Sequence, residues 1–322
     1  MRKVTRLLAM LSGAIFALLI AVAPANAQAP GTWVSGVGDD VNPCSRTAPC
    51  KTFAGAISKT AVNGEIRCLD PGGFGAVTIT KSITIDCHEM YASILNSSVN
   101  GIVVNFDLFQ ATDTRRTVRL RNLNINGVNT GLIGIKIVGG AASAGSEIHI
   151  EDMLIDGQFS GGARGISDER TGGGEIYITD TTVRNTGATG IAIVPTSGAT
   201  TIHAVLDNVR VENCNFGTAF GSGVRAMINR SVFSGNTQAG VEAEGPSGAT
   251  EVNVTGSVMS SNGIGVQNGG GTVTIRLADN DLAFNTTAVS GATQSFGTNR
   301  ISGSVGTVPV FIGADAPAKG QR

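Results

Sequence analysis

The side chains best suited to chemistry in this 322-residue chain recur at equivalent positions of short segments in which polar and apolar residues alternate. Aligning these segments produces two polar rows, Arg119, His149 and Tyr177 in the first and Arg121, Glu151, Thr179 and Asp207 in the second. If the segments stack as neighbouring strands, the two rows lie side by side on one strand face. We expect binding or catalysis to take place on this face.

An acidic sugar chain is one ligand that fits the face. Guanidinium groups pair with carboxylates and an aromatic ring offers an apolar surface, so Arg119, Arg121 and Tyr177 are the expected ligand-binding residues. Added salt should weaken such a contact, because exposed charges are screened within about 8 Å at physiological ionic strength. The competing interpretation is an ordinary solvated strand face made of cross-strand charge pairs.

The same rows also permit catalysis by a pair of carboxylates. Glycoside hydrolases place two carboxyl groups about 5–10 Å apart across the bond that they cleave. Glu151 and Asp207 lie two repeats apart, or about 9.6 Å if neighbouring strands stack at about 4.8 Å. This separation is typical of enzymes that invert the anomeric centre. If the face is catalytic, we expect Glu151, Asp207 and the neighbouring His149 to act there.

Motifs for metals, nucleotides and serine nucleophiles are absent from the sequence. No cysteine pair has zinc-site spacing, and Asp39 with Asp40 falls short of the oxygen ligands that calcium takes. No Gly-rich loop ends in Lys-Ser or Lys-Thr, and no Gly-x-Ser-x-Gly is present. We therefore expect no metal and no cofactor. A net charge of -1 offers no electrostatic footprint for nucleic acid.

A repeated strand unit must position the two rows. From about Ile66 onward, alternating segments rich in Val, Ile and Thr are followed by Gly, Asn, Ser or Asp, which tolerate tight corners. One apolar position recurs about every 25 residues, at Ile125, Ile155, Val183, Val211, Phe233, Met259, Leu282 and Ile301. We call these eight residues the anchor row.

A repeat of this length indicates a solenoid or a propeller. A propeller blade needs about 40 residues and an aromatic motif of its own, whereas this chain has one Trp. An antiparallel β-sandwich is the other alternative, but Asn-Gly turns seldom stand between alternating segments of equal length. The pattern therefore predicts an all-β fold, a right-handed parallel β-helix of about nine or ten coils.

Several local features complete this prediction. Helical spacing of apolar residues over Lys51–Ala61 predicts a short N-terminal capping helix that ends before Asn63-Gly64. The shared register of Asn236, Asn262 and Asn285 predicts a ladder of hydrogen-bonded amides, as in cross-β assemblies. The run Asp168-Glu169-Arg170 lies between glycines and predicts a charged loop that bulges from the surface.

The first 27 residues have the pattern of a secretion signal. A basic start is followed by the apolar run Leu7–Ala23 and by Ala25-Asn26-Ala27, which predicts cleavage before Gln28. An uncleaved anchor is the alternative, but the run is shorter than the roughly 20 residues that span a bilayer. We expect a secreted or periplasmic protein with no other membrane span. The expected organisation is signal peptide 1–27, entry and capping module 28–65, β-helix 66–312 and loose tail 313–322.

All five cysteines follow the predicted signal, and export permits disulfides. Cys44 and Cys50 enclose a short polar loop, which predicts a bond between them. Cys68 and Cys87 each end an alternating segment, so they are either bonded or simply buried as small apolar residues. Cys214 is then left over.

The N-terminal part of the chain resembles a known family. The matching segments are Val34–Cys44, Pro49-Cys50-x-Thr52-Phe53, Ala56-Ile57, Gly64-Glu65-Ile66 and Asp70–Phe74. They are similar to the entry module of bacterial secreted right-handed parallel β-helix repeat proteins of the pectin-lyase-like superfamily. The resemblance implies the same fold and, more weakly, a polysaccharide as partner. The motifs of its pectin esterases, polygalacturonases and pectate lyases are missing; for example, no His is flanked by Gly on both sides.

Three functions therefore stay open. The first is an exported β-helix that acts as a binding or structural module at the cell envelope or outside, toward polysaccharide or an envelope glycan. The second is a carbohydrate-active enzyme, either a polysaccharide lyase or an inverting glycoside hydrolase. The third is a tailspike-like or adhesin-like surface protein that assembles through its exposed stack. The missing enzyme motifs favour the first over the second, and polar outward rows disfavour the third.

The cysteine pattern yields a direct prediction. Peptide mapping of exported protein without reduction should recover Cys44 and Cys50 in one linked peptide. Closing a loop of this size should contribute about 2 kcal/mol to stability. Recovery of both residues as free thiols would contradict the assignment.

Overall fold

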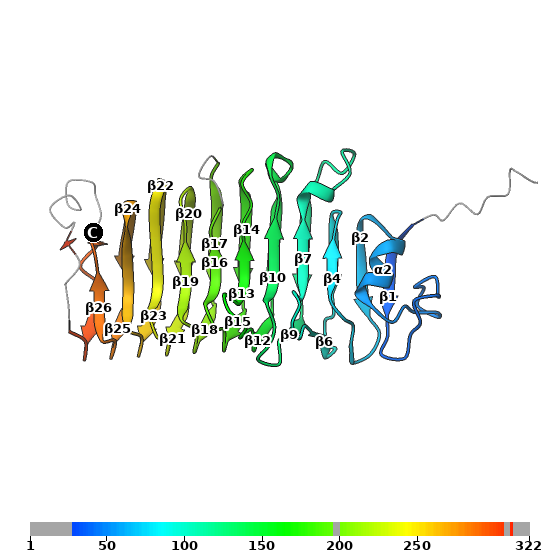
Figure 1. The fold of residues 1–322 in the computed structure, drawn as a ribbon, viewed down its shortest axis with the longest axis horizontal. Coiled ribbons are helices and arrows are strands. Elements are labelled where there is room, and N and C mark those ends of the chain that lie inside the picture. Colours follow the sequence, from blue (N-terminus) through cyan, green and yellow to red (C-terminus); the bar gives the residue numbers. More distant parts are fainter. Residues whose placement is uncertain (1–27, 196–199, 306–309, 312–322) are drawn as a thin grey trace, which may run out of the picture.

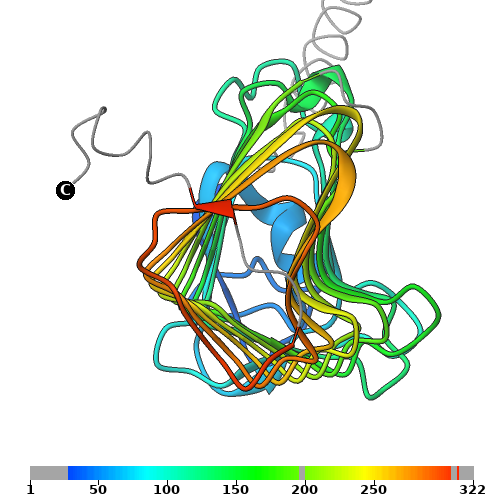
Figure 2. The same cartoon turned by 90° about the vertical axis from the view of Figure 1, so that its left-hand side faces the viewer.

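The computed structural model describes residues 28–195, 200–305 and 310–311 of the chain. Its strands wind into successive coils, and a complete coil contributes one strand to each of three stacks (Figures 1 and 2). Neighbouring coils pair in parallel in all three stacks. The second stack has ten strands in the described part of the chain, which matches the predicted nine or ten coils.

The strands are grouped by stack. The first stack contains β1 (Ala29–Val34), β2 (Thr60–Cys68), β5 (Ile83–Asp86), β8 (Thr117–Arg121), β11 (Glu147–Glu151), β14 (Gly174–Thr179), β17 (Ile202–Asp207), β20 (Val224–Asn229), β27 (Gln294–Ser295) and β29 (Val310–Phe311). The second contains β3 (Gly72–Gly73), β6 (Ala92–Leu95), β9 (Leu123–Asn126), β12 (Leu154–Asp156), β15 (Thr182–Arg184), β18 (Arg210–Glu212), β21 (Val232–Ser234), β23 (Val258–Ser260), β25 (Asp281–Ala283) and β28 (Arg300–Ser302). The third contains β4 (Val77–Ile79), β7 (Ile102–Asn105), β10 (Ile133–Val138), β13 (Arg164–Asp168), β16 (Thr189–Ile193), β19 (Phe216–Phe220) and β26 (Thr287–Ser290). The long strands β22 (Ala239–Thr255) and β24 (Ile264–Ala278) belong to the third stack at their start and to the first at their end.

The anchor row forms one continuous inward row of the second stack. Each of its residues pairs with the next through adjacent strands, from Ile125 to Ile301. All of them are fully buried except Ile301, which is 37% exposed in the last of these strands. The predicted register is therefore confirmed, and with it the parallel β-helix.

The corner between the first and second stacks explains the frequent Asn and Asp. One residue turns the chain there in each coil, and its φ is positive at Asn122, Asp152, Asp180 and Asn208. Asn and Asp tolerate this left-handed conformation better than other residues with a side chain. The polar turn residue of the repeat is thus set by backbone geometry.

The predicted amide ladder is present inside the coils. Asn236 donates from Nδ2 to Oδ1 of Asn262 at 2.9 Å, and Asn262 donates in the same way to Asn285 at 2.9 Å. All three side chains are buried. Because a buried amide without partners is costly, the ladder fixes the stacking of these coils.

The N-terminal capping helix is shorter than predicted. Helix α2 spans Phe53–Lys59, with Thr52 as N-cap, whose hydroxyl accepts a hydrogen bond from the Gly55 amide at 2.9 Å. The helix buries Phe53 and two further apolar residues against the first coils. It ends because Thr60 is extended and begins β2, so the strand starts before Asn63-Gly64.

Two disulfides lie in the same N-terminal region. Cys44 and Cys50 form the predicted bond, and Cys68 is bonded to Cys87, which resolves the alternative left open by the sequence. Cys214 is a free, buried thiol, and burial raises its pKa. The predicted signal peptide and the tail 313–322 lie outside the described residues. Within the described residues, no helix is long and apolar enough to cross a membrane.

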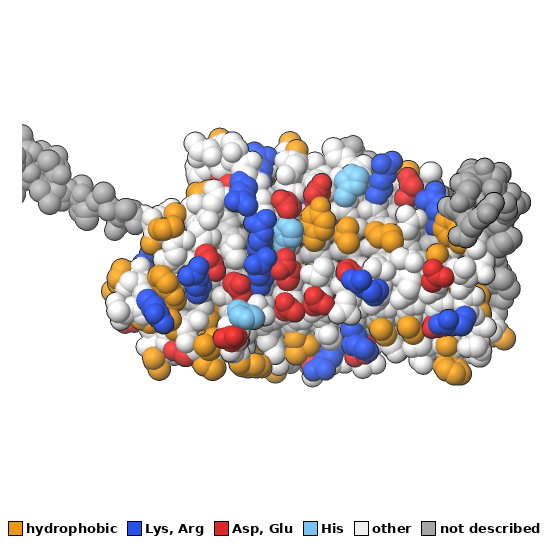
Figure 3. Space-filling model, turned by 180° about the vertical axis from the view of Figure 1, so that it is seen from behind, with side chains coloured by type: hydrophobic (Ala, Val, Ile, Leu, Met, Phe, Trp, Pro, Cys, Tyr) orange, Lys and Arg blue, Asp and Glu red, His pale blue; other side chains and the backbone are white. Residues whose placement is uncertain are grey.

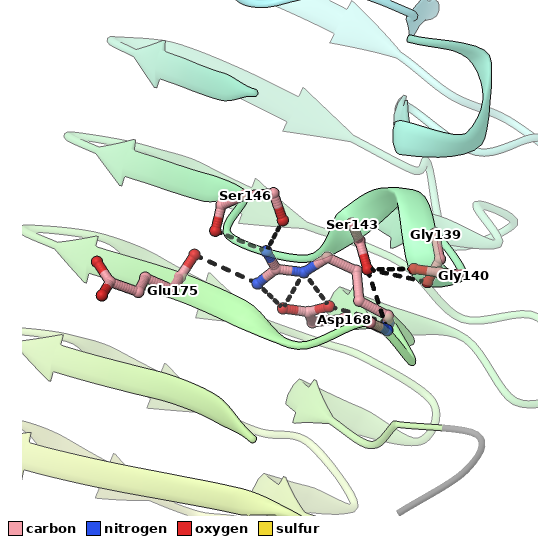
Figure 4. A network of polar contacts seen from close by, with 8 residues as sticks. Gly139, Gly140, Ser143, Ser146, Asp168 and Glu175 are labelled. Atoms are coloured by element: carbon pink, nitrogen blue, oxygen red, sulfur yellow. Dashed lines mark hydrogen bonds and ion pairs between the residues drawn. The ribbon is translucent and has the colours of Figure 1, made fainter. Parts of the chain in front are cut away.

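The prediction of a bulging loop at Asp168-Glu169-Arg170 is wrong. Asp168 ends β13, and both Asp168 and Arg170 are fully buried. The guanidinium of Arg170 donates to Asp168 at 2.7 and 2.9 Å and to the Ser146 hydroxyl at 2.6 Å (Figure 4). It also lies over the ring of Phe106 at 5.7 Å. Burial of this ion pair is tolerated because each of its two charges has a hydrogen-bonded partner. The composition of the sequence alone does not reveal these partners.

The anchor row can be tested in the middle of the stack. Val183→Asp places an unpaired carboxylate between Ile155 and Val211, which should cost several kcal/mol. We expect insoluble protein or a melting temperature lower by about 10 °C. Arg184→Ala, the outward neighbour, is the matched control and should melt within about 3 °C of wild type. Wild-type melting of Val183→Asp would contradict the register.

The buried ion pair makes a second stability prediction. Asp168→Ala leaves the Arg170 guanidinium buried without a counter-ion and should cost about 3–5 kcal/mol. Glu212→Ala removes the partner of exposed Arg210 and should cost at most about 1 kcal/mol. Thermal or chemical denaturation of the two variants measures the difference. Equal effects would show that the pair at Asp168 is solvated.

Candidate functional site

Strands β8, β11, β14 and β17 bring the two predicted polar rows together on one face. His149 lies between Arg119 and Tyr177 in register, and Glu151 pairs with Arg121 on the coil before it. Asp207 lies two coils beyond Glu151, with Thr179 between them. These side chains alternate with buried residues of the same strands, so they point outward. We call this surface the charged face (Figure 3).

A third row of the charged face is absent from the sequence prediction. Glu147 pairs with Glu175, and Glu175 pairs with His203. Each of these residues lies two residues before the first predicted row on its strand, so its side chain points to the same face. The alignment of the sequence missed this row because Glu147 and Glu175 each stand one residue before the alternating segments, at Ile148 and Ile176, from which the rows were built. This row adds carboxylates beside the predicted cations.

His149 is held between two carboxylates. Its Nε2 contacts Glu147 in an ion-pair geometry, and its Nδ1 lies 3.7 Å from Oε1 of Glu151. The hydrogen bond from His149 lowers the pKa of Glu147, and the charges of Arg119 and Arg115 act in the same direction. The imidazole therefore links the outer two rows of the face.

Tyr177 stacks on His149 rather than offering a free ring face. The two ring centroids are 4.9 Å apart and the planes meet at 16°. The Tyr177 hydroxyl donates to Glu175 at 2.7 Å, and this hydrogen bond raises the pKa of Tyr177. The ring face toward His149 is covered, so a sugar would meet the edge and hydroxyl of Tyr177.

The two candidate catalytic carboxylates are both paired with arginines. Glu151 Oε2 lies 2.7 Å from Arg121 Nε, although that N–H is not aligned for a hydrogen bond. Asp207 contacts Arg230 and accepts a hydrogen bond from Asn229 at 3.1 Å. Neither carboxylate is an isolated acid, and the arrangement is that of cross-strand charge pairs.

The coil of β8 concentrates positive charge at one end of the charged face. Arg115 and Arg116 precede the strand, and Arg119 and Arg121 lie on it. Figure 3 shows Lys and Arg side chains in a column across the face. Arg121 pairs with Glu151 and Arg116 donates to the Ala142 carbonyl, whereas Arg115 and Arg119 form no ion pair within the described residues. We call these four residues the arginine column.

Metal ligands do not gather on this face. Among the residues that the structure describes, no group of three or more His, Cys, Asp or Glu side chains is arranged to hold a metal ion. Asp40 accepts hydrogen bonds from the Lys51 and Thr52 amides at 2.8 and 2.9 Å and from the Thr52 hydroxyl. Its carboxylate therefore fastens the start of helix α2.

Comparisons with known proteins support the fold. No family model matches the chain, and no curated protein matches it in sequence. Among solved structures it is similar to pectate lyase Pel9A, with 14% identity, a TM-score of 0.57, and coverage of 87% of this chain and 78% of that chain. A lacto-N-biosidase of family GH136 from Eubacterium ramulus shares 11% identity with the chain, at a TM-score of 0.42 and with coverage of 87% of this chain and 67% of that chain.

The likeness to Pel9A extends over most of both chains, and at this identity it shows the fold alone. It agrees with the three parallel stacks and the coil register described above. The chain therefore has a parallel β-helix fold like that of Pel9A, the fold that its N-terminal resemblance implied.

Proposed function

We propose that this protein is an exported module that binds acidic polysaccharides, with the arginine column as its contact surface. The observation that carries the proposal is the pair Arg115 and Arg119, which project from one coil without an ion-pair partner in the described residues. Guanidinium groups bind carboxylates in a bidentate manner. A uronic acid polymer presents its carboxylates in a line, and the stacked coils of a solenoid present their outward side chains in a line as well.

The fold comparison supports the class of ligand. Pel9A is a pectate lyase, and pectate is an acidic polysaccharide. The two disulfides fit an oxidising compartment, as does the predicted secretion signal. Both observations support a secreted or periplasmic protein that meets envelope or extracellular glycans.

Binding is favoured over catalysis on the charged face. Glu151 and Asp207 are engaged with Arg121 and Arg230, whereas a hydrolase needs one carboxyl group that carries a proton to the leaving oxygen. Assembly through an outward apolar row is also disfavoured, because such a row is short in the described residues. In the row of Tyr177, the apolar side chains of Val205 and Met227 are followed on the next coil by the polar Asn253.

The arginine column can be tested with a charge-matched control. The double variant Arg115→Ala/Arg119→Ala should bind polygalacturonate at least about tenfold more weakly than wild type, a loss of about 1.4 kcal/mol. Arg210→Ala/Arg300→Ala removes the same charge from the second stack and should bind within twofold of wild type. Titration calorimetry at low and high salt should also show a weaker salt dependence for the first variant.

Three results would contradict this proposal. They are equal losses in both double variants, equal binding of neutral dextran, and no binding of polygalacturonate by wild type. Glu151→Gln and Asp207→Asn should leave binding unchanged, because amides keep the shape of the carboxylates. Loss of product release in these two variants, with binding intact, would assign catalysis to the charged face instead.

A further inference from the structure

A shallow groove follows the corner between the first and second stacks. Its first part has a volume of about 500 Å³ and its second part about 200 Å³, and Asp180 lines both. The lining residues come from the successive coils of β6, β9, β12, β15, β18 and β21. Six stacked strands span about 24 Å at a spacing of about 4.8 Å. We call this surface the corner groove.

A longer turn stands at the N-terminal end of the corner groove. Five residues separate β5 from β6, whereas the single residue Asn122 separates β8 from β9 on the next coil. Cys87 begins the longer turn and is bonded to Cys68, and the Met90 amide donates to the Cys87 carbonyl at 3.0 Å. The turn is therefore held in place without a ligand.

Tyr91 is the last residue of this turn and lines the groove. It is 64% exposed, and within the described residues no other aromatic ring packs on it. Its hydroxyl accepts a hydrogen bond from Nδ2 of Asn124 at 3.1 Å, and its carbonyl accepts from the Gly72 amide at 3.0 Å. A ring that is both fixed and open offers its apolar face to the C–H face of a sugar at little cost in entropy.

The floor of the groove interrupts the pairing that other corner residues make. Asn122 donates to Asp86 at 2.9 Å, and Asn208 donates to Asp180 at 2.6 Å. Asp152 and Asp180 occupy the corner on neighbouring coils, and two ionised carboxylates cannot donate to each other. The Asp152 carboxylate is exposed and has no hydrogen bond or ion pair with a described residue. Its oxygens can therefore accept hydrogen bonds from a ligand.

Guanidinium groups line the second part of the groove. Arg210 and Arg230 both lie there, and their side chains are more than half exposed. Arg210 pairs with Glu212 and Arg230 with Asp207. Because a guanidinium has five N–H groups, each arginine keeps donors for a ligand after making its ion pair. The groove thus offers acceptors in its first part and donors in its second.

A sugar hydroxyl suits both parts because it donates and accepts hydrogen bonds. An acidic sugar would meet like charge at Asp152 and Asp180. The ammonium group of an amino sugar has no acceptor, so it cannot use the donors of Arg210 and Arg230. The mixed lining therefore favours an uncharged, hydroxyl-rich chain, and the straight course of the groove favours an extended one.

We propose that the corner groove binds a neutral, extended polysaccharide along the axis of the solenoid. One sugar ring stacks on Tyr91. Hydroxyl groups of the following sugars donate to Asp152 and Asp180, in hydrogen bonds strengthened by the charge of the acceptor. Hydroxyl groups farther along accept from Arg210 and Arg230. This ligand differs in charge from the one proposed for the arginine column, so the protein could link two kinds of glycan.

The stacking platform is tested by calorimetry of the exported protein with cellohexaose, xylohexaose and mannohexaose. Wild type should bind at least one of them with nearly equal affinity at low and high salt, because a neutral ligand has no charge to screen. Tyr91→Ala should weaken this binding at least about tenfold. Tyr91→Phe keeps the ring and should stay within about threefold. The control Tyr177→Ala removes a tyrosine of the charged face and should stay within about twofold.

The free carboxylate is tested with a matched corner residue. Asp152 and Asp279 both have a positive φ, and Asp279 turns the corner on a later coil, beyond the groove. Glycine accepts this conformation without strain, so Asp152→Gly and Asp279→Gly should both fold, which circular dichroism checks. Asp152→Gly should bind the neutral hexasaccharide at least about fivefold more weakly, and Asp279→Gly within about twofold of wild type.

Four outcomes would overturn the proposal. They are no binding of any of the three hexasaccharides by wild type, unchanged binding in Tyr91→Ala, equal losses in Asp152→Gly and Asp279→Gly, and tighter binding of chitosan than of the neutral chains. The arginine column is judged separately. Arg115→Ala/Arg119→Ala should leave binding of the neutral chains within about twofold of wild type. If that variant loses polygalacturonate while wild type binds no neutral chain, the proposed function stands and the corner groove proposal fails.

Discussion

The parallel register between neighbouring coils is the constraint on which the rest of this structure depends. Each coil must place an apolar side chain over the one before it, as Val183 lies between Ile155 and Val211. Once the inward rows are aligned, strand alternation aligns the outward rows as well. Residues far apart in sequence, such as Arg119, His149 and Tyr177, thereby lie side by side on neighbouring strands, and no loop is needed to bring them together.

This constraint explains how much the sequence could predict. The anchor row, the amide ladder of Asn236, Asn262 and Asn285, and the register of the charged face all follow from repeated residue types at matching positions. Features that do not repeat were out of reach. The partners of Arg170 include the Ser146 hydroxyl and Phe106, which the coil winding brings close, so the sequence showed only a charged run. The corner groove was hidden for the same reason, since its lining depends on which side chains are neighbours in space.

The charges on the surface of the solenoid are satisfied to different degrees. On the charged face, pairs such as Arg121 with Glu151 neutralise each other, whereas Arg115 and Arg119 form no ion pair within the described residues. In the corner groove, Asp152 has no partner among the described residues. A ladder of paired charges stabilises the fold, whereas departures from pairing are where chemistry becomes available. Reading a solenoid for function therefore means finding the positions at which its outward rows fail to pair.

The disulfides and the capping helix lie at one end of the solenoid, and this uneven distribution has a consequence for its dynamics. Both disulfides and helix α2 lie in the first coils, whereas the last anchor residue, Ile301, keeps over a third of its surface in water. Each coil is stabilised mainly by its two neighbours, so opening spreads by nearest-neighbour steps. Local opening should therefore begin at the C-terminal coils and become less frequent in each coil toward the disulfide-bonded N-terminal end. Hydrogen exchange would record this as a gradient of amide protection, with Asn285 and Leu282 exchanging before Ile85.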